Sequence, residues 1–407
     1  MRIAFIHNNA KTGASVHALM LGRRLQEKME VTFLLEELQA DGLDFSEIRD
    51  VRLFPYTPEQ LARRKGEWPL HVSLIVRLRM LLFKLKYLRG ADKLSFLWAP
   101  FYFLEKKWYR KRKMMPDGLV EHLDKYNQDY DCYIVMGNYN SIPFLLKEEC
   151  ARKTILIPLV HYEKSQFILS AHKITRKFPF LAYNTEAEKT LCERIHGKAS
   201  AGEVIGSGIE PVETNESRWA EFKQTKGIPE TYLLYVGRIT PGKVGELFPY
   251  FLTYTERHPD MDCKLIVIGE NNSSNRIEND RIQYLGFVED GIKADLIAHA
   301  TIVVNPSAVE SLSLVVLEAM SVGVPVLVNG KCEVLKQHCE KSGGGFYYWN
   351  YMMFDDALSR LLGDAELRRQ MGATGRTYQQ ENYNWSMICS KMEAAIESVI
   401  TPLAAKH

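Results

Sequence analysis

The sequence predicts an α/β fold of two doubly wound parallel-sheet domains that face a cleft. Two observations support this prediction. Short apolar runs alternate with helical patterns along the chain, and the alternation starts again after a glycine- and proline-rich stretch near the middle. Strands covered on both faces read as continuous apolar runs, which is the pattern here. With 407 residues, the chain is long enough for two such domains.

The first half predicts a parallel sheet with helices on both faces. Apolar runs predict strands at 2–7, 30–35, 130–136, 154–160 and 180–183. Helical patterns predict helices at 14–28 and 185–195. Residues 1–206 are therefore assigned to the first domain, with a basic insertion at 70–115. The stretch from Gly206 to Pro211, followed by polar residues up to Pro229, is expected to be the linker.

The second half repeats the alternation. Apolar runs predict strands at 232–236, 264–268, 282–285, 302–305 and 325–328, with helices between them. Residues 207–384 are assigned to the second domain. The tail from 366 to 400 is expected to be helical, with a break at 382–385.

Composition narrows the class of protein. The net charge of +2 does not indicate nucleic-acid binding, and no nucleic-acid partner is expected. Seven scattered cysteines without a CxxC pair predict reduced thiols in a cytoplasmic protein, and no zinc site. The first residues read as a strand rather than a signal peptide. No apolar run reaches the roughly 18 residues that a membrane span needs.

Two carboxylates, Glu310 and Glu318, stand on either side of an apolar stretch. Glu310 follows a predicted strand, and Glu318 is expected a little over two turns along the next helix. Open α/β sheets bind ligands at the carboxyl ends of their strands, and carboxylates there can accept hydrogen bonds from sugar hydroxyls. Alternatively, Glu318 could favour the helix macrodipole, and Glu310 could be a solvated loop residue.

Two cations follow the predicted strand 232–236. Gly237 lets the backbone approach a ligand closely. Arg238 offers a planar fork that matches phosphate oxygens, and Lys243 offers a compact charge. Together they could neutralise a diphosphate leaving group, or they could be solvated surface cations.

The second half resembles the donor domain of GT-B glycosyltransferases, which are built from two Rossmann-like domains. It is most similar to the large retaining family 4 (glycosyl transferases group 1), over about residues 230 to 330. The motifs that carry the resemblance are Gly237-Arg238 with Lys243, Ile266-Val267-Ile268-Gly269, Leu285-Gly286-Phe287-Val288, and Pro306-Ser307 with Glu310 and Glu318. Ser311, Leu312 and Ser313 stand where many members carry Gly-Phe-Gly.

This resemblance implies roles for individual residues. Arg238 and Lys243 would hold the pyrophosphate of a nucleotide sugar, Glu310 would face the donor sugar, and Glu318 the ribose. The implied catalytic residues are Arg238, Lys243, Glu310 and His161. The implied donor-binding residues are Gly13, Gly237, Phe287, Val288, Ser311, Leu312, Ser313, Leu314 and Glu318.

The resemblance also implies the chemistry. A hexose from a donor such as a UDP- or GDP-hexose would be transferred with retention, by front-face displacement. The diphosphate would help to remove the proton of the acceptor hydroxyl, so neither a metal nor a further cofactor is expected. Residues 385–407 would form a helix that returns to the first domain.

The segment 75–115 is strongly basic. It contains twelve lysines and arginines but only two acidic residues, Asp92 and Glu105. Its net charge is therefore +10, which leaves −8 for the rest of the chain. Aromatic and aliphatic residues lie between the cations. This composition suits an anionic membrane surface or a phosphorylated, lipid-linked acceptor. The charges could instead be solvated, with the apolar residues packed on the first domain.

We therefore predict a glycosyltransferase, cytoplasmic or peripheral on the inner face of the plasma membrane. It would act on a glycan or lipid-linked acceptor in cell-surface polysaccharide or glycolipid assembly. The alternatives are a non-catalytic sugar-nucleotide binding module and another GT-B enzyme, such as a nucleotide-sugar epimerase or an inverting transferase.

Overall fold

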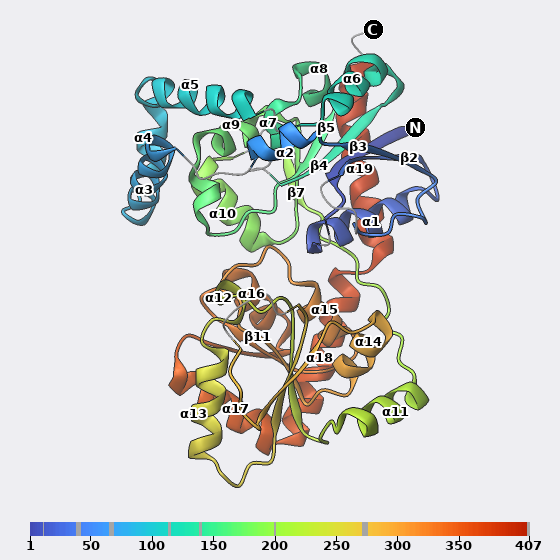
Figure 1. Cartoon of the computed structure of the whole chain (residues 1–407), viewed down its shortest axis with the longest axis vertical. Coiled ribbons are helices and arrows are strands. Elements are labelled where there is room, and N and C mark those ends of the chain that lie inside the picture. Colours follow the sequence, from blue (N-terminus) through green and yellow to red (C-terminus); the bar gives the residue numbers. More distant parts are fainter. Residues whose placement is uncertain are drawn as a thin grey trace. The chain divides into compact units, whose positions relative to one another are not determined.

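The computed structural model describes residues 1–10, 12–37, 42–64, 69–112, 115–137, 141–198, 201–270 and 276–404 (Figure 1). The chain divides into two compact units. The first unit comprises Met1–Gly208 and Ser386–His407, and the second unit comprises Ile209–Trp385. Each unit is built on one parallel sheet, so the predicted α/β fold with two doubly wound domains is confirmed.

The first unit contains a seven-stranded parallel sheet in the order β3-β2-β1-β4-β5-β6-β7. Its strands are β1 (Arg2–Asn8), β2 (Glu30–Glu37), β3 (Asp50–Pro55), β4 (Cys132–Met136), β5 (Thr154–Ile157), β6 (Phe180–Tyr183) and β7 (Gly202–Val204). Sequence reasoning missed the edge strands β3 and β7, because β3 is half exposed and polar and β7 is very short. The prediction also ran β5 on to Val160, whereas Pro158 and a φ of 54° at Leu159 end the strand earlier.

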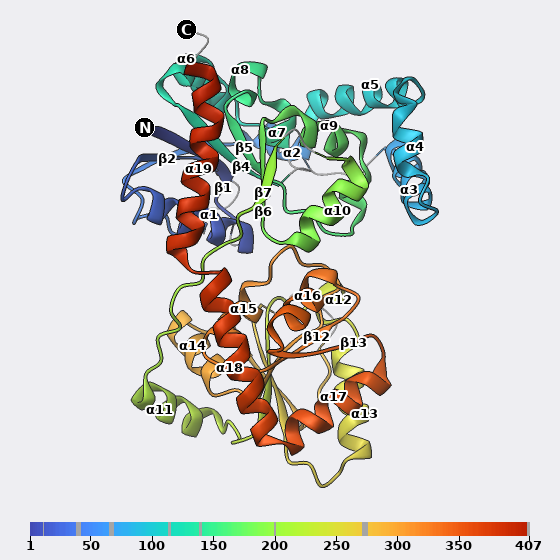
Figure 2. The ribbon, with the colours of Figure 1, turned by 180° about the vertical axis from the view of Figure 1, so that it is seen from behind.

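Helices cover both faces of this sheet (Figures 1 and 2). They are α1 (Gly13–Leu25), α2 (Pro58–Arg64), α3 (Leu70–Lys84), α4 (Leu88–Lys93), α5 (Ser95–Arg112), α6 (Asp117–Tyr126), α7 (Ser141–Leu145), α8 (Glu148–Ala151), α9 (Leu169–Lys177), α10 (Glu186–His196) and α19 (Trp385–Ala404). Lys28, just after α1, pairs with Glu393 of α19 at 2.8 Å. Ile388, Met392 and Ile396 of α19 are buried, so this helix is a full part of the first unit.

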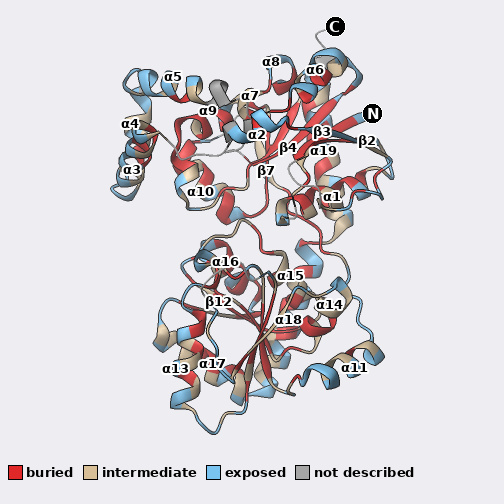
Figure 3. Ribbon diagram, in the orientation of Figure 1, coloured by how far each residue is buried: buried red, intermediate tan, exposed pale blue. Residues whose placement is uncertain are grey.

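The second unit contains a six-stranded parallel sheet in the order β10-β9-β8-β11-β12-β13. Its strands are β8 (Tyr232–Val236), β9 (Lys264–Ile268), β10 (Ile282–Gly286), β11 (Ile302–Asn305), β12 (Val326–Asn329) and β13 (Gly345–Tyr348). Figure 3 shows buried strands in the middle of the unit, and β8, β9, β11 and β12 are mostly buried. The sequence did not predict the edge strand β13, which is only partly buried.

The helices of the second unit follow the expected alternation. They are α11 (Glu216–Lys226), α12 (Pro241–Val244), α13 (Leu247–Arg257), α14 (Asp290–Ala298), α15 (Leu314–Ser321), α16 (Glu333–Ser342), α17 (Tyr351–Gly363) and α18 (Ala365–Asn382). The polar stretch that was expected to be linker contains α11, which Asn215 caps. The break between α18 and α19 lies where the sequence predicts it.

The strand order of the second sheet reverses between β8 and β11. From β8 the chain moves one way through β9 and β10, and from β11 it moves the other way through β12 and β13. The loops that leave β8 and β11 therefore diverge, and ligands of open α/β sheets bind at such a point. The motifs with Arg238 and Glu310 follow these two strands directly.

Two glycines let the loops after β8 and β9 pass each other closely. Gly269 has a φ of 128°, and a Cβ added there would lie 2.2 Å from the carbonyl oxygen of Gly237. A side chain at position 269 would therefore push the Gly237 turn out of place.

We expect Gly269→Ala to destabilise the second unit by about 3 kcal/mol, because it adds both backbone strain and a clash with backbone. Urea unfolding followed by circular dichroism measures this. Gly363→Ala is the control, since a Cβ there meets no atom within 4 Å. Equal unfolding midpoints for the two variants would contradict the close approach.

Candidate functional site

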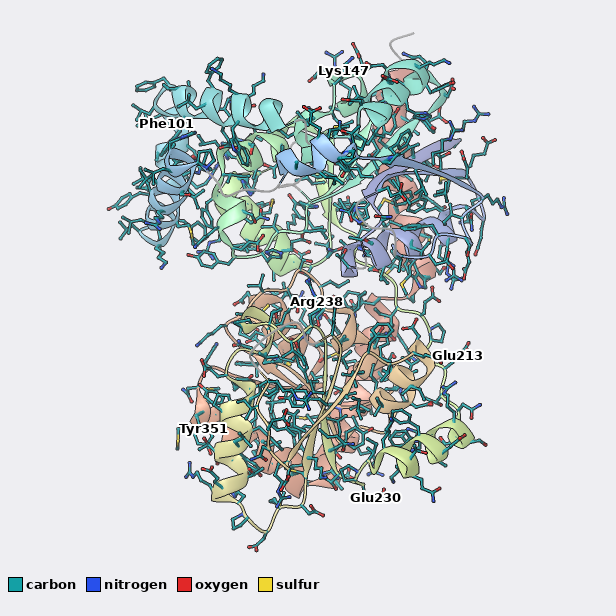
Figure 4. All side chains as sticks on the ribbon, viewed as in Figure 1. Phe101, Lys147, Glu213, Glu230, Arg238 and Tyr351 are labelled. Atoms are coloured by element: carbon teal, nitrogen blue, oxygen red, sulfur yellow. The ribbon has the colours of Figure 1, made fainter. Side chains whose placement is uncertain are left out.

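The turn after β8 presents two cations at the carboxyl edge of the second sheet. Gly237 has a φ of 152°, and the Tyr235 hydroxyl donates a hydrogen bond to the carbonyl of Arg238 at 2.9 Å. The Arg238 side chain is exposed at this edge (Figure 4). Lys243 lies on α12, which begins at Pro241. The turn is thus fixed from within the sheet while its cations remain accessible.

The loop after β11 is held by two asparagines at the ends of neighbouring strands. Asn305, the last residue of β11, accepts a hydrogen bond from Ser307 N at 3.0 Å and donates one to Ser313 Oγ at 2.9 Å. Asn329, at the end of β12, donates to the carbonyl of Pro306 at 2.9 Å. Both ends of the loop are therefore tied to the sheet, and its middle presents Glu310.

The two loops meet in an ion pair. Lys243 Nζ lies 2.7 Å from Glu310 Oε1 and also donates to the carbonyl of Val309 at 3.4 Å. The side chains are 34% and 17% exposed, so the pair is only partly screened by water. Sequence reasoning named both residues for separate ligand groups, and the structure brings them into direct contact.

Arg238 belongs to the same neighbourhood. Burial raises the pKa of Tyr235, the nearby Glu310 carboxylate raises it further, and Arg238 opposes them. Glu310 and Arg238 therefore both lie close enough to Tyr235 to change the pKa of its phenol. Two positive groups and one carboxylate thus gather where the strand order reverses.

Ser313 keeps a glycine-like backbone. It has a φ of 72°, a conformation that is uncommon for residues other than glycine. It precedes α15, and its own side chain does not cap the first N–H groups of that helix. Such N–H groups attract anions. Ser311 and Leu314 are partly buried and Leu312 is buried, so this loop packs against the rest of the second unit.

A buried histidine holds the loop from behind. His338 Nε2 donates to the carbonyl of Leu312 at 2.8 Å, so its Nδ1 accepts from the Tyr378 hydroxyl at 3.1 Å. Burial lowers the pKa of His338 to about 4, which keeps the imidazole neutral near pH 7. In this tautomer the ring donates to Leu312 and accepts from Tyr378. A protonated ring has no acceptor nitrogen, so it would lose the hydrogen bond from Tyr378.

Glu318 lies a little over one turn along α15, not two, because the helix begins at Leu314. Its Oε1 pairs with Lys293 Nζ of α14 at 3.1 Å. Its Oε2 is buried and has no hydrogen-bond partner among the described residues. A carboxylate oxygen in this position can accept a bond from a ligand hydroxyl.

The turn after β10 carries the remaining predicted donor-binding residues. Gly286 has a φ of 70°, Phe287 is 84% exposed, and Val288 is partly buried. An exposed aromatic ring at the carboxyl edge of a sheet is available to a flat ligand. Within the described part of the chain, no hydrogen bond or ion pair links the side chains of Phe287 and Val288 to Glu310 or Glu318.

In the first unit, Gly13 opens α1 at the carboxyl edge of β1. Thr12 caps the helix by accepting from Ser15 N at 3.3 Å. Ser15 Oγ also contacts His7 Nε2 at 3.0 Å, and burial lowers the pKa of His7 to about 4. A Cβ added at Gly13 would meet nothing within 4 Å, so the space beside this helix start is open.

His161 follows β5 in the first unit and is partly exposed. Its Nδ1 lies 3.6 Å from Glu163 Oε1. The loop before it is fixed by the buried Glu188, which accepts N–H groups from Val160 at 2.7 Å and Asn184 at 2.6 Å. Glu188 thus joins the loops after β5 and β6 and sets where His161 stands.

Three residues escaped sequence reasoning: Lys293, Asn305 and His338. Asn305 could have been found, because a polar residue ends an apolar strand just before the acidic loop. Lys293 and His338 lie on other helices, where nothing in their spacing marks a link to the loop. Within the described ranges, no three His, Cys, Asp or Glu side chains gather closely enough to bind a metal ion.

Known structures define the class of fold. The structure of Anabaena HepE in complex with UDP and glucose matches 98% of this chain and 100% of its own, with a TM-score of 0.69 and 16% identity. The fold is therefore the GT-B fold of glycosyltransferases. Residues 230–364 match the family model "Glycosyl transferases group 1", so the resemblance seen in the sequence is confirmed over this part of the second unit.

Curated relatives agree with this family. An uncharacterized glycosyltransferase of Methanocaldococcus jannaschii is 28% identical over 222 residues, which is 50% of this chain and 56% of the relative. Alpha-D-kanosaminyltransferase of Streptomyces kanamyceticus is 27% identical over 42% of this chain and 47% of the relative. The matches span about half the length of these relatives.

We expect acid to weaken the second unit through His338. Its ordinary pKa of 6.5 falls to about 4 on folding, so between these values the unfolded chain binds a proton that the folded chain excludes. The free energy of unfolding is therefore highest above pH 6.5. It decreases by about 3 kcal/mol in total as the pH falls to 4.

Urea unfolding of the whole chain between pH 7 and pH 4 tests this expectation. His338→Gln should have a shallower pH dependence than the wild type. His299→Gln, which changes a partly exposed histidine of the same unit, should not. Identical slopes for wild type and His338→Gln would rule out the assigned role.

Proposed function

We propose that this protein is a retaining glycosyltransferase that moves a hexose from a nucleotide sugar to a glycan or lipid-linked acceptor. The Lys243–Glu310 pair beside Arg238, at the point where the strand order reverses, carries this proposal. Cations and a carboxylate at one edge suit a donor that contains both a diphosphate and a sugar.

In the proposed reaction, Arg238 and Lys243 stabilise the negative charge that develops on the departing diphosphate. The N–H groups at the start of α15 add to this stabilisation. Glu310 orients the donor sugar, and the free oxygen of Glu318 accepts from the ribose. Gly13 keeps the donor-binding role and His161 the catalytic role that the family resemblance implies. The protein thus contributes placement and fixed charges, and no residue is assigned as a covalent nucleophile.

The proposal is tested by incubating the protein with UDP-, GDP- and ADP-hexoses and following release of the nucleoside diphosphate. Slow donor hydrolysis or transfer supports the proposal, and NMR of the anomeric configuration of the product distinguishes retention from inversion. Donor binding without any turnover in the presence of membrane extract would favour the non-catalytic module. Binding of no nucleotide sugar would overturn both functions.

We expect Lys243→Ala to lower kcat by roughly a hundredfold, because a preorganised charge at the leaving group is lost. Lys223→Ala is a matched control, since Lys223 also forms an ion pair, with Glu230 on the surface of the second unit. Initial rates with the active donor measure both variants. Unchanged kcat in Lys243→Ala would contradict the assigned role.

We also propose that the first unit docks on an anionic membrane surface, because α3 exposes a stripe of leucines although Val72, Ile75 and Val76 of the same helix pack inward. Arg79 is completely buried, while Leu70, Leu74, Leu78, Leu81 and Leu85 are about half exposed or more. At 3.6 residues per turn these leucines fall within an arc of about 80°. Water does not favour such a stripe, whereas the apolar boundary of a bilayer does.

Helix α5 also combines a buried charged residue with exposed aromatic residues. Glu105 is buried and accepts N–H groups of Leu169 at 3.1 Å and Ser170 at 2.8 Å. Phe96 and Phe103 are 70% and 66% exposed. Figure 4 shows Phe101 on the same helix, away from the sheet. None of the helices in the described ranges is both long and apolar enough to cross a bilayer, so the proposed mode of binding is peripheral.

Charge supports an anionic surface. Exposed cations flank the apolar stripes, among them Arg77, Lys84, Lys86 and Lys107. Each cation near an anionic bilayer contributes about 1 kcal/mol. On this proposal the protein works at the cytoplasmic face of the membrane, where it meets a lipid-linked acceptor.

We expect Leu74→Asp combined with Leu81→Asp to weaken vesicle binding at least about tenfold, because two exposed leucines that would enter the bilayer are replaced by charged residues. Co-sedimentation with phosphatidylcholine vesicles, with and without phosphatidylglycerol, measures this. The control is Leu53→Asp with Leu61→Asp, two exposed leucines of β3 and α2. Equal sedimentation of both double variants would refute docking through α3.

A further inference from the structure

A pocket of about 370 Å³ lies between α9 and the helices of the insertion. Trp98, Ala99 and Tyr102 of α5 and Leu169 of α9 give it apolar walls. Asp92 is the only carboxylate that lines it within the described part of the chain, whereas several basic side chains do. The pocket lies outside the loops that form the proposed donor and acceptor sites.

The inner charges of this pocket are already paired. Arg79 contacts the carboxylate of Asp92 and donates to the carbonyl of Phe167 at 2.9 Å. Lys177 donates to the carbonyl of Pro143 at 3.2 Å and also to that of Leu146. Glu105 is engaged by the N–H groups that start α9. These groups hold the pocket open and add no free negative charge.

The cations near its rim are only partly neutralised, because Arg89 Nη1 lies 3.7 Å from Asp92 Oδ2 and Arg79 contacts the same carboxylate. A Cβ added at Gly197 would lie 2.2 Å from a guanidinium nitrogen of Arg89 and 2.9 Å from one of Arg176, so the two arginines converge. Arg89 Nη1 is buried and makes no hydrogen bond to a described residue. Burial, and then the neighbouring Arg176, lowers the pKa of Arg89. These like charges repel each other unless an anion joins them.

The other basic groups of the rim add to this imbalance. Lys173 Nζ lies 3.6 Å from the ring centroid of Tyr102, and burial and Lys106 lower the pKa of Lys173. His172 Nδ1 lies 3.8 Å from Asp92, and burial lowers the pKa of His172 to about 4, so it remains neutral at pH 7. Asp92 is thus shared by Arg79, Arg89 and His172 and cannot balance the remaining cations.

We propose that this pocket binds a phosphate group carried on an apolar chain, which anchors the acceptor. Lys173 and Arg176, which line the pocket, would hold the phosphate oxygens, since guanidinium and ammonium groups match that anion, and Arg89 beside Arg176 would add to the positive charge. Trp98 and Tyr102 would line the start of the chain, and the exposed Leu97 and Phe101 next to them would continue the apolar path. The acceptor role rests on the proposed glycosyl transfer, whereas the anion site rests on these contacts alone.

Isothermal titration of the full chain tests the site with three probes: dodecyl phosphate below its micellar concentration, inorganic phosphate, and uncharged dodecyl maltoside. We expect dodecyl phosphate to bind most tightly. Lys173→Ala with Arg176→Ala should raise its Kd at least tenfold, because both side chains are exposed at the rim and can be removed without disturbing the core. Arg49→Ala with Lys125→Ala removes the same charge elsewhere on the first unit and should leave Kd unchanged.

Inorganic phosphate binding as tightly as dodecyl phosphate, with the same loss in the rim variant, would also support the site and would assign it a soluble phosphate. Binding of neither phosphate, or equal affinity of wild type and rim variant, would overturn it. UDP binding is measured on the same proteins. If wild type binds dodecyl phosphate but not UDP, the proposed function fails and the anion pocket stands.

Discussion

The reversal of strand order between β8 and β11 is the constraint on which the site of the second unit depends. It brings together a glycine turn and an acidic loop that are far apart in the sequence. Asn305 ties the acidic loop to its own strand, and His338 supports it from α16. Since Asn305 is uncharged and partly buried and His338 is buried and neutral, these supports add no competing ion to the charged groups.

Sequence reasoning recovered the inner strands of both sheets, because strands covered on both faces read as continuous apolar runs. It missed β3, β7 and β13, which are short or half exposed at the edges. It placed Glu310 correctly after β11, yet set Glu318 one turn too far along its helix. The left-handed backbone of Ser313 moves the helix start to Leu314, and nothing in the residue types announces that bend.

The insertion shows a different limit of sequence reasoning. The sequence reveals a strongly basic segment with many apolar residues, but it does not say which side chains face inward. In the structure, Arg79 and Glu105 take inward positions because each finds a buried partner, the first in Asp92 and the second at the start of α9. Leucines and phenylalanines then occupy the outward face. Tertiary pairing, rather than helical periodicity, decides the orientation.

The contact between Lys243 and Glu310 has a consequence for selectivity in the proposed reaction. Before the donor arrives, each charge satisfies the other. A diphosphate that attracts the ammonium group releases the carboxylate, which then needs a hydroxyl donor of its own. A nucleotide sugar supplies both a diphosphate and a sugar hydroxyl. A nucleoside diphosphate without the sugar leaves the Glu310 carboxylate without a hydrogen-bond donor. In the proposed reaction, this exchange of partners would favour the nucleotide sugar over the nucleoside diphosphate.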